Sequence, residues 1–218
     1  MAANTTPALS ISDLSFRWQR NGGFALEADR FDIKRGERVL MTAPSGAGKT
    51  TLISLMAGIM RPDNGSIRIG DHDLVAMRPA QRDRFRADNI GLIFQSLNLI
   101  PYLTALENIV LPLRFAPARL KTAGGWAEAR KSAEAMLAEI GLPVEQHGQL
   151  PASRLSVGQQ QRVAVLRAMI GAPGLIIADE PTSALDADRR AAFLEMLGSQ
   201  LQRTGAALLM LSNDHEIA

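Results

Sequence analysis

The stretch that decides the fold is Ala43-Pro44-Ser45-Gly46-Ala47-Gly48-Lys49-Thr50-Thr51. The apolar run Val39-Leu40-Met41 precedes it and apolar residues at helical spacing follow it, which predicts a strand, a glycine-containing loop and a helix. In this setting Gly-Lys-Thr binds nucleotide phosphates, because the loop turns main-chain N–H groups inward and the helix directs its positive end at the same point. We expect Lys49 to contact the β- and γ-phosphates and the Thr50 hydroxyl to ligate Mg²⁺.

Ala43 departs from this phosphate-loop pattern, which begins with glycine. An alanine there costs about 1 kcal/mol if the backbone requires a positive φ, and little if φ is negative. Taken alone, the stretch also fits an ordinary glycine-rich turn between a strand and a helix.

The composition is that of an ordinary globular protein, with 218 residues, 46% hydrophobic and 21% charged, and it favours a single domain. A formal net charge of +2 with scattered basic residues does not indicate a nucleic-acid partner. The absence of cysteine excludes disulfides and thiolate metal sites. We expect no signal peptide at the N-terminus, and no apolar stretch reaches the roughly 20 residues that span a bilayer. The sequence therefore predicts a protein that is soluble or held at a membrane only by a partner.

Antiparallel strands are predicted before the phosphate loop. Residues 9–18 alternate apolar and polar, Asn21-Gly22-Gly23 is a turn, and two further strands are expected at 24–28 and 31–33. A short alternating strand at 66–69 follows the loop helix, and His72 is expected in a solvated turn.

A mostly helical insertion is predicted from residue 96 to about 150–160. A charged helix at 79–86 and an apolar strand at 89–94 precede it, and helices are expected at 104–111 and 127–140, with Pro112 and Pro117 breaking the pattern between them. Ser156 should cap a helix over 158–170, and Asp186 another helix after the strand at 175–178; a last strand covers 206–211. This alternation of strands and helices predicts an α/β fold with a mainly parallel sheet.

Asp179 and Glu180 end the apolar strand at 175–178, at the sheet edge where ligands of open α/β sheets bind. Two carboxylates there can divide the work, with Asp179 holding Mg²⁺ and Glu180 polarising an attacking water. Adjacent strand residues point in opposite directions, which we expect to separate the two roles. The alternative is a pair of solvated acids at a strand end.

Three other features carry weaker signals. Leu155-Ser156-Val157-Gly158-Gln159 combines a helix cap with glycine and could bind an anion, although Gln159 three residues after Ser156 also fits a plain capping box. Gln95 could reach Mg²⁺ or the attacking water, or be structural. Trp18 could stack on a nucleobase, or lie at the edge of the core. His147 and His215 have no partner at ligand spacing, so a transition-metal site is not expected.

With these motifs in this order, the chain resembles the nucleotide-binding domain of ABC transporters over nearly its whole length. Walker A corresponds to 43–50, the Q-loop to Gln95, the signature to 155–159, Walker B with its glutamate to 175–180, and the D-loop to Ser183-Ala184-Leu185-Asp186. The segments Ile93–Pro101 and Thr104–Asn108 look most similar to the subfamily of the lipoprotein-releasing LolD and macrolide-exporting MacB ATPases.

The resemblance implies a P-loop NTPase core with an N-terminal antiparallel β subdomain and an inserted helical subdomain, all in one ATP-binding domain over 1–218. It implies an ATPase that uses ATP and Mg²⁺ and forms a head-to-tail dimer, most simply a homodimer, in which Ser156 and Gly158 of one copy close over ATP on the other. It also implies an integral membrane subunit docked beside the helical insertion, at the cytoplasmic face of the membrane, and no nucleic acid.

The same resemblance assigns roles to residues. The catalytic positions are Glu180, Gln95 and Asn213, and the Mg²⁺ positions are Thr50, Gln95 and Asp179. The nucleotide-binding positions are Trp18, Ala43, Pro44, Ser45, Gly46, Ala47, Gly48, Lys49, Thr50, Thr51, Ser156, Val157, Gly158 and Gln159.

Three residues depart from the family pattern: Ala43, Val157 in place of a signature glycine, and Asn213 in place of the switch histidine. Asparagine can hydrogen-bond a phosphate or a water but cannot become cationic, and His215 could substitute only if the loop register shifts. Relatives usually continue beyond the position of Ala218, so we expect a truncated form or an abbreviated lobe. These departures motivate a second hypothesis, an ATP-binding switch that hydrolyses poorly. A small-molecule P-loop kinase is a third, but it has no use for the signature segment.

Overall fold

The computed structural model describes residues 6–18, 25–183 and 185–213. The predicted turn at 21–23, Ala184 of the predicted D-loop and His215 lie outside these ranges.

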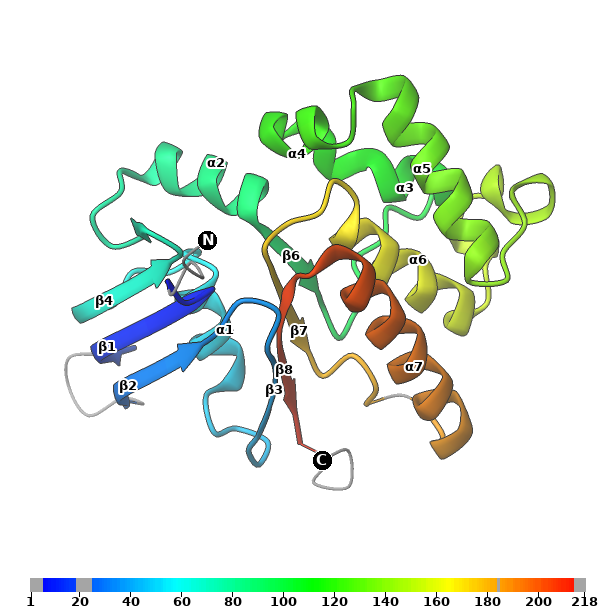
Figure 1. The fold of residues 1–218 in the computed structure, drawn as a ribbon. Coiled ribbons are helices and arrows are strands. Elements are labelled where there is room, and N and C mark those ends of the chain that lie inside the picture. The colour runs from blue at the N-terminus through cyan, green and yellow to red at the C-terminus, as the bar shows by residue number, and fades with distance from the viewer. Residues whose placement is uncertain (1–5, 19–24, 184, 214–218) are drawn as a thin grey trace.

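The described strands form two four-stranded sheets (Figure 1). The antiparallel sheet has the order β2-β1-β4-β5, and the parallel sheet has the order β3-β8-β7-β6. The strands are β1 (Leu9–Arg17), β2 (Ala25–Ile33), β3 (Arg38–Thr42), β4 (Asn64–Ile69), β5 (His72–Asp73), β6 (Ile90–Ile93), β7 (Leu175–Asp179) and β8 (Ala207–Ser212). The predicted fold class, an α/β core with a parallel sheet and an N-terminal antiparallel sheet, is confirmed.

One prediction for the antiparallel sheet is wrong, because the two strands expected at 24–28 and 31–33 are the single strand β2. Its register with β1 is unbroken from the pair Arg17 and Ala25 to the pair Leu9 and Ile33. The polar residues Asp29 and Arg30 shift the apolar alternation by one position, so the side-chain pattern suggests a break that the main-chain ladder does not have.

The helices are α1 (Lys49–Met56), α2 (Pro79–Asn89), α3 (Ala105–Val110), α4 (Pro117–Thr122), α5 (Trp126–Glu139), α6 (Val157–Met169) and α7 (Ala187–Thr204). Short 3₁₀ segments at Leu111–Arg114 and Ala152–Arg154 and a π-helical turn at Val144–Gly148 join them. Pro112 and Pro117 interrupt the helical pattern as predicted: α3 ends at Val110, and each proline lies in the first turn of a new helical segment. Proline is tolerated there because the first N–H groups of a helix have no partner within it.

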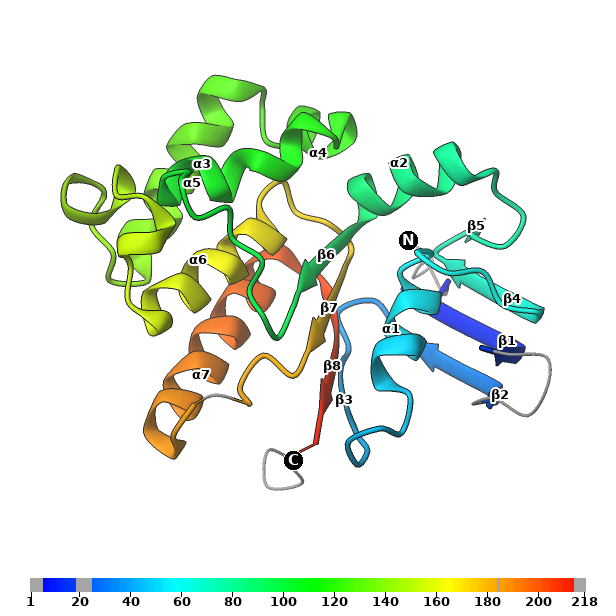
Figure 2. The same cartoon turned by 180° about the vertical axis from the view of Figure 1, so that it is seen from behind.

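The parallel sheet separates two hydrophobic cores. On β7, Leu175 and Ile177 face the core shared with α1 and the antiparallel sheet, whereas Ile176 and Ala178 face the core shared with α6 and α7. Burial on both faces explains why β7 is a continuous apolar run. Figures 1 and 2 accordingly show the antiparallel strands on one side of the parallel sheet and helices α3 to α7 on the other.

Gly91 fixes how closely β6 and α6 approach. A β-carbon at this position would lie 2.2 Å from the Ala168 carbonyl oxygen and 2.6 Å from the Ile176 side chain, so only glycine fits. The C-terminal part of α6 is therefore held directly against the edge strand that leads to Gln95. None of the helices in the described part of the chain combines the length and apolar character of a membrane span.

Candidate nucleotide-binding site

The loop between β3 and α1 has the backbone that the sequence predicts. Gly46 and Gly48 adopt left-handed conformations with φ of 81° and 89°. Ala43 is not among the residues with positive φ, so an alanine at the first loop position costs little. Its N–H donates to the Ser212 carbonyl at 3.2 Å, which ties the start of the loop to the end of β8.

Lys49 lies across this loop and is held at three points. Its Nζ donates to the carbonyl oxygens of Ala43 at 2.7 Å and Pro44 at 3.0 Å, and it lies 3.2 Å from Oε1 of Glu180. The side chains of Lys49 and Glu180 are only 8% and 13% exposed. The ammonium group is thus fixed over the loop, at the point where the end of β7 meets the start of α1.

The donors of the loop fit a polyphosphate. In the described part of the chain, the main-chain N–H groups of Ser45, Gly46 and Gly48 have no hydrogen-bond acceptor. A β-carbon on Gly46 would meet nothing within 4 Å, and the first turn of α1 carries no acidic side chain. Unpaired N–H groups at a helix N-terminus beside a lysine attract anions.

Asp179 and Glu180 meet consecutive residues of α1. Thr50 donates to Oδ2 of Asp179 at 3.5 Å, while Glu180 reaches Lys49. The expectation that the two carboxylates point in opposite directions is wrong, because β7 ends at Asp179 and Glu180 adopts a left-handed φ of 44°. This turn brings both carboxylates to the phosphate loop.

The pKa of Asp179 is raised, first because burial removes water from the carboxylate and second because Glu180 lies beside it. The hydrogen bond from Thr50 and the charge of Lys49 act in the opposite direction. A hydroxyl and a carboxylate oxygen next to a phosphate site are the hard ligands that Mg²⁺ takes, so the donor set fits this ion. Within the described residues, no group of three His, Cys, Asp or Glu side chains forms a metal site.

Gln95 joins this cluster through Ser183. Its Nε2 donates to Oγ of Ser183 at 3.3 Å, and that hydroxyl donates to the Glu180 carbonyl at 3.1 Å. The described contacts place Gln95 beside the Glu180 turn and not directly on Thr50 or Asp179. The sequence gives no signal for the linking role of Ser183, since a serine after a strand end is common in loops.

Trp18 lies immediately after β1 and reaches α1. Its indole N–H donates to Oγ1 of Thr51 at 3.1 Å, and its ring packs edge-on against Phe16 with centroids 5.7 Å apart. Trp18 as a whole remains 57% exposed. An exposed aromatic ring anchored two residues after Lys49 is a suitable stacking surface for a base.

We expect Trp18→Ala to weaken ATP binding by about 5- to 150-fold, the range of about 1–3 kcal/mol measured for base stacking. Trp18→Phe should retain most of the affinity, because it keeps an aromatic face. Trp126→Ala, which removes the other tryptophan on the start of α5, is the matched control. Nucleotide titrations of all three variants measure this effect, and equal affinities for Trp18→Ala and Trp126→Ala would reject the stacking role.

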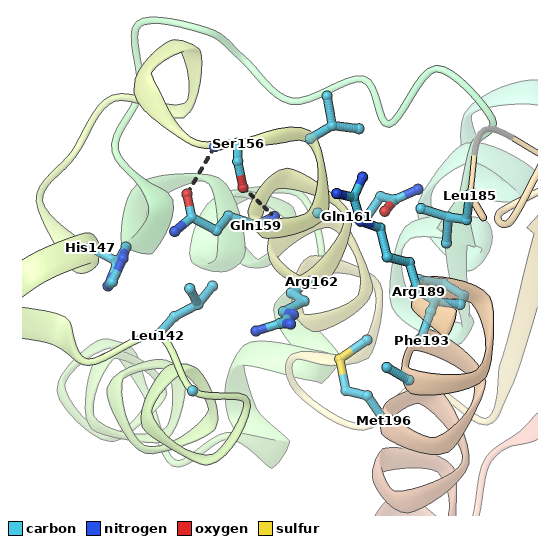
Figure 3. A pocket seen from close by; sticks show the side chains of 14 residues that line it. Leu142, His147, Ser156, Gln159, Gln161, Arg162, Leu185, Arg189, Phe193 and Met196 are labelled. Atoms are coloured by element: carbon cyan, nitrogen blue, oxygen red, sulfur yellow. Dashed lines mark hydrogen bonds between the residues drawn. The ribbon is translucent and has the colours of Figure 1, made fainter. Parts of the chain in front are cut away.

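The signature segment forms a second cluster at the start of α6. Figure 3 shows Ser156 and Gln159 capping each other: Ser156 N–H donates to Oε1 of Gln159 at 2.8 Å, and Gln159 N–H donates to Oγ of Ser156 at 3.3 Å. The plain capping box is therefore present. The Ser156 hydroxyl accepts in this bond and keeps its own proton to donate.

A cavity of about 620 Å³ adjoins this cap, between α6 and the start of α7. It is lined by Ser156, Val157, Gly158 and Gln159 but by none of residues 43–51. Val157 is 59% exposed at the first position of the helix. Within one copy, the phosphate loop and the signature segment are thus separate clusters.

The remaining candidates are placed as follows. Asn213 is exposed and directly follows Ser212, which pairs with Thr42, so it leaves the sheet beside the start of the phosphate loop. His72 belongs to the short strand β5 and not to a turn, and its ring lies 4.9 Å from that of Phe85.

The chain is similar to known proteins in both sequence and structure. The family model described as ABC transporter matches residues 26–183. An uncharacterized ABC transporter ATP-binding protein of Mycobacterium tuberculosis is 43% identical over 181 residues, covering 82% of this chain and 52% of the relative. The sulfate/thiosulfate import ATP-binding protein CysA 2 of Chromobacterium violaceum is 42% identical over 201 residues, covering 92% and 51%. The lipoprotein-releasing system ATP-binding protein LolD of Chromohalobacter salexigens is 32% identical over 227 residues, covering 100% and 92%.

Among solved structures, a dimeric post-hydrolysis state of the ATP-binding cassette MJ0796 bound to ADP and Pi superposes with a TM-score of 0.79. It is 31% identical, and the match covers 96% of this chain and 90% of that one. The chain spans about half the length of the first curated relatives that it matches.

Proposed function

The chain belongs to the ABC transporter family, and from this premise we propose that it binds and hydrolyses ATP to drive a membrane partner. The observation that carries this proposal is the contact set of Lys49. Its ammonium group joins the phosphate loop to Glu180, so the group that would bind phosphate and the group that would activate water are 3.2 Å apart.

In the proposed reaction, the N–H groups of the loop and Lys49 hold the β- and γ-phosphates. Thr50 and Asp179 would hold Mg²⁺, and the bound ion would neutralise part of the negative charge on the phosphates. Glu180 accepts a proton from water as the water oxygen bonds to the γ-phosphorus. The bond from that phosphorus to the β–γ bridging oxygen breaks, giving ADP and phosphate.

We propose that a second copy completes the site. The signature cluster carries an N-terminal helix end and the Ser156 hydroxyl, yet it lies apart from the loop on its own chain. A head-to-tail arrangement would bring the Ser156 cap of one copy to the γ-phosphate on the other. The dimeric form of the similar MJ0796 cassette supports this arrangement.

A surface on the helical side supports a membrane partner. A groove of about 670 Å³ lies beside α3 and the start of α5, and three exposed aromatic residues, Tyr102, Phe115 and Trp126, line it. Exposed aromatic clusters of this kind mark protein interfaces. We propose that a helix of an integral membrane subunit docks there, which would place the chain at the cytoplasmic face of the membrane.

The match to LolD covers nearly the full length of both proteins, which supports a LolD/MacB type of export or lipoprotein extraction. The matches to the import protein CysA 2 and to uncharacterized proteins support the coarser assignment, an ATP-binding subunit of an ABC transporter.

The alternative is an ATP-binding switch with little hydrolysis. Val157 supports it, because its β-branched side chain is exposed at the first position of α6 and would crowd the γ-phosphate on the other copy in the proposed head-to-tail dimer. Ala43 no longer argues for it, since its backbone does not need glycine.

Steady-state release of phosphate from magnesium-ATP, by the wild-type chain alone and with its membrane partner, separates the two functions. A transport ATPase should hydrolyse ATP well above the rate of Glu180→Gln in the same preparation. Binding of ATP with rates equal to that variant in both preparations would favour the switch.

A further inference from the structure

The segment that follows Gln95 has an unusual backbone. Leu97 and Asn98 both have left-handed conformations, with φ of 57° and 49°. For residues with a β-carbon this costs of order 1–3 kcal/mol each, and it persists only when the surroundings impose it. The N–H of Leu97 donates to the Phe94 carbonyl at 3.0 Å, which closes a turn around Gln95 and Ser96.

Arg167 of α6 forms two hydrogen bonds to the main chain of this turn. One terminal nitrogen donates to the Asn98 carbonyl at 2.6 Å and the other donates to the Leu97 carbonyl at 2.5 Å. The planar guanidinium therefore spans two successive carbonyls, which the single ammonium of lysine cannot do with the same geometry.

Burying the positive charge of Arg167 at this position costs free energy unless its hydrogen bonds compensate. Arg167 is only 9% exposed, and its pKa is lowered because burial removes water from the charge. Among the described residues, no carboxylate forms an ion pair with it. The carbonyls of Leu97 and Asn98 are thus the polar partners that the structure describes for this buried charge.

A second buried side chain holds the rest of the segment. Asn108 of α3 is fully buried, accepts from the Ile100 N–H at 2.8 Å, and donates to the carbonyls of Ile100, Leu103 and Thr104. The chain from Gln95 to the start of α3 is thus fixed to two helices, and α6 itself is fixed against β6 at Gly91.

We propose that Arg167 is a positioning residue for Gln95. By holding Leu97 and Asn98 in left-handed conformations, it sets the turn that presents the Gln95 amide to Ser183, whose hydroxyl donates to the Glu180 carbonyl. Gln95 would thereby stand ready to contact the Mg²⁺ that Thr50 and Asp179 would hold. Without this fork, both residues relax to negative φ and the amide moves away from the site. The inference deepens the proposed ATPase function and rests on it for its kinetic consequence.

The test is a double-mutant cycle of Arg167→Lys with Gln95→Ala, read as the magnesium concentration for half-maximal ATP hydrolysis and as kcat. Loss of a positioning contact to a metal site typically costs about 10- to 100-fold, so we expect a change of this size for Arg167→Lys in the wild-type background. In the Gln95→Ala background we expect less than about a twofold further change, because the residue it positions is already gone. If Arg167→Lys causes the same fold-change in the wild-type and Gln95→Ala backgrounds, the proposal is overturned.

Arg162→Lys is the matched control. Arg162 is also on α6 and donates to one main-chain carbonyl, that of Ile140 at 3.0 Å, away from Gln95. Its replacement should leave the magnesium dependence unchanged. A shift equal to that of Arg167→Lys would show that any loosening of α6 has this effect, and would reject a specific role for Arg167.

Asn98 offers a test that leaves the buried arginine in place, in case Arg167→Lys does not fold. Asn98 is exposed. Asn98→Val keeps the N–H that donates to the Ser96 carbonyl at 2.6 Å but strongly disfavours the left-handed conformation, so it should reproduce the Arg167→Lys defect. Asn98→Gly also lacks the Asn98 side chain but allows the left-handed conformation, so it should behave as wild type. Wild-type magnesium dependence in Asn98→Val would contradict the proposal.

Hydrogen exchange without nucleotide separates this inference from the proposed function. Arg167→Lys should speed exchange at the N–H groups of Leu97 and Asn98 relative to Arg162→Lys. Unchanged exchange rates at these two N–H groups in Arg167→Lys would reject the proposal that Arg167 holds the turn. If the wild-type chain does not hydrolyse ATP, the proposed function fails, and exchange still decides whether Arg167 holds this segment.

Discussion

Replacing Lys49 with alanine is expected to weaken magnesium-ATP binding by about 30-fold or more and to abolish hydrolysis. Truncating one partner of a buried, hydrogen-bonded charge pair costs about 2–5 kcal/mol, and the triphosphate would lose such a partner. The loss is compounded here, because Lys49 also lies against Glu180, beside the half-buried Asp179. Without the ammonium group, two carboxylates would face the phosphates with no cation between them.

Calorimetric titration with magnesium-ATP measures this effect. Lys131→Ala is the matched control, since it removes one positive charge from an exposed position on α5, where the lysine pairs with Glu128. It should bind ATP as the wild type does. Equal affinities for Lys49→Ala and Lys131→Ala would exclude the loop as the phosphate site.

Glu180→Gln is expected to lower kcat for ATP hydrolysis by about 10²- to 10⁴-fold, the usual contribution of a general base. Glutamine keeps the size and the hydrogen bonding of the side chain but cannot accept a proton. The Glu180 main chain, which donates to the Leu211 carbonyl at 2.9 Å and accepts from Ser183, should be unaffected. ATP affinity should therefore be retained or increased.

Single-turnover kinetics and an equilibrium titration on the same preparation distinguish the two effects. Glu128→Gln, the same change on an exposed part of α5, should leave both unchanged. Loss of ATP binding in Glu180→Gln would assign Glu180 to binding and not to catalysis.

The sequence predicts the site well where local geometry is fixed by short-range rules. A strand, a glycine-bearing loop and a helix must bring Lys49 and Thr50 to the end of β3, and the apolar run at 175–178 must bring Asp179 to the same edge of the parallel sheet. The Ser156 cap follows from residue types three positions apart. Each of these features can be predicted without knowledge of contacts between distant parts of the chain.

The features that the sequence does not reveal depend on the conformation of single residues or on distant partners. Glu180 turns toward the loop because it leaves β7 in a left-handed conformation, which no residue pattern signals. Arg167 and Asn108 find their partners across 69 and 8 residues of chain, respectively. A charged residue in the otherwise apolar run from Ala164 to Met169 was the one available signal for Arg167.

The central claim is that ATP held by the phosphate loop of one copy is covered by the Ser156 cap of another. Light scattering of Glu180→Gln after gel filtration tests it most directly, with and without magnesium-ATP. With nucleotide, we predict a particle of twice the 23.5 kDa mass of one chain, and its loss when Lys49→Ala is added. A mass that stays at one chain under saturating magnesium-ATP would contradict the account.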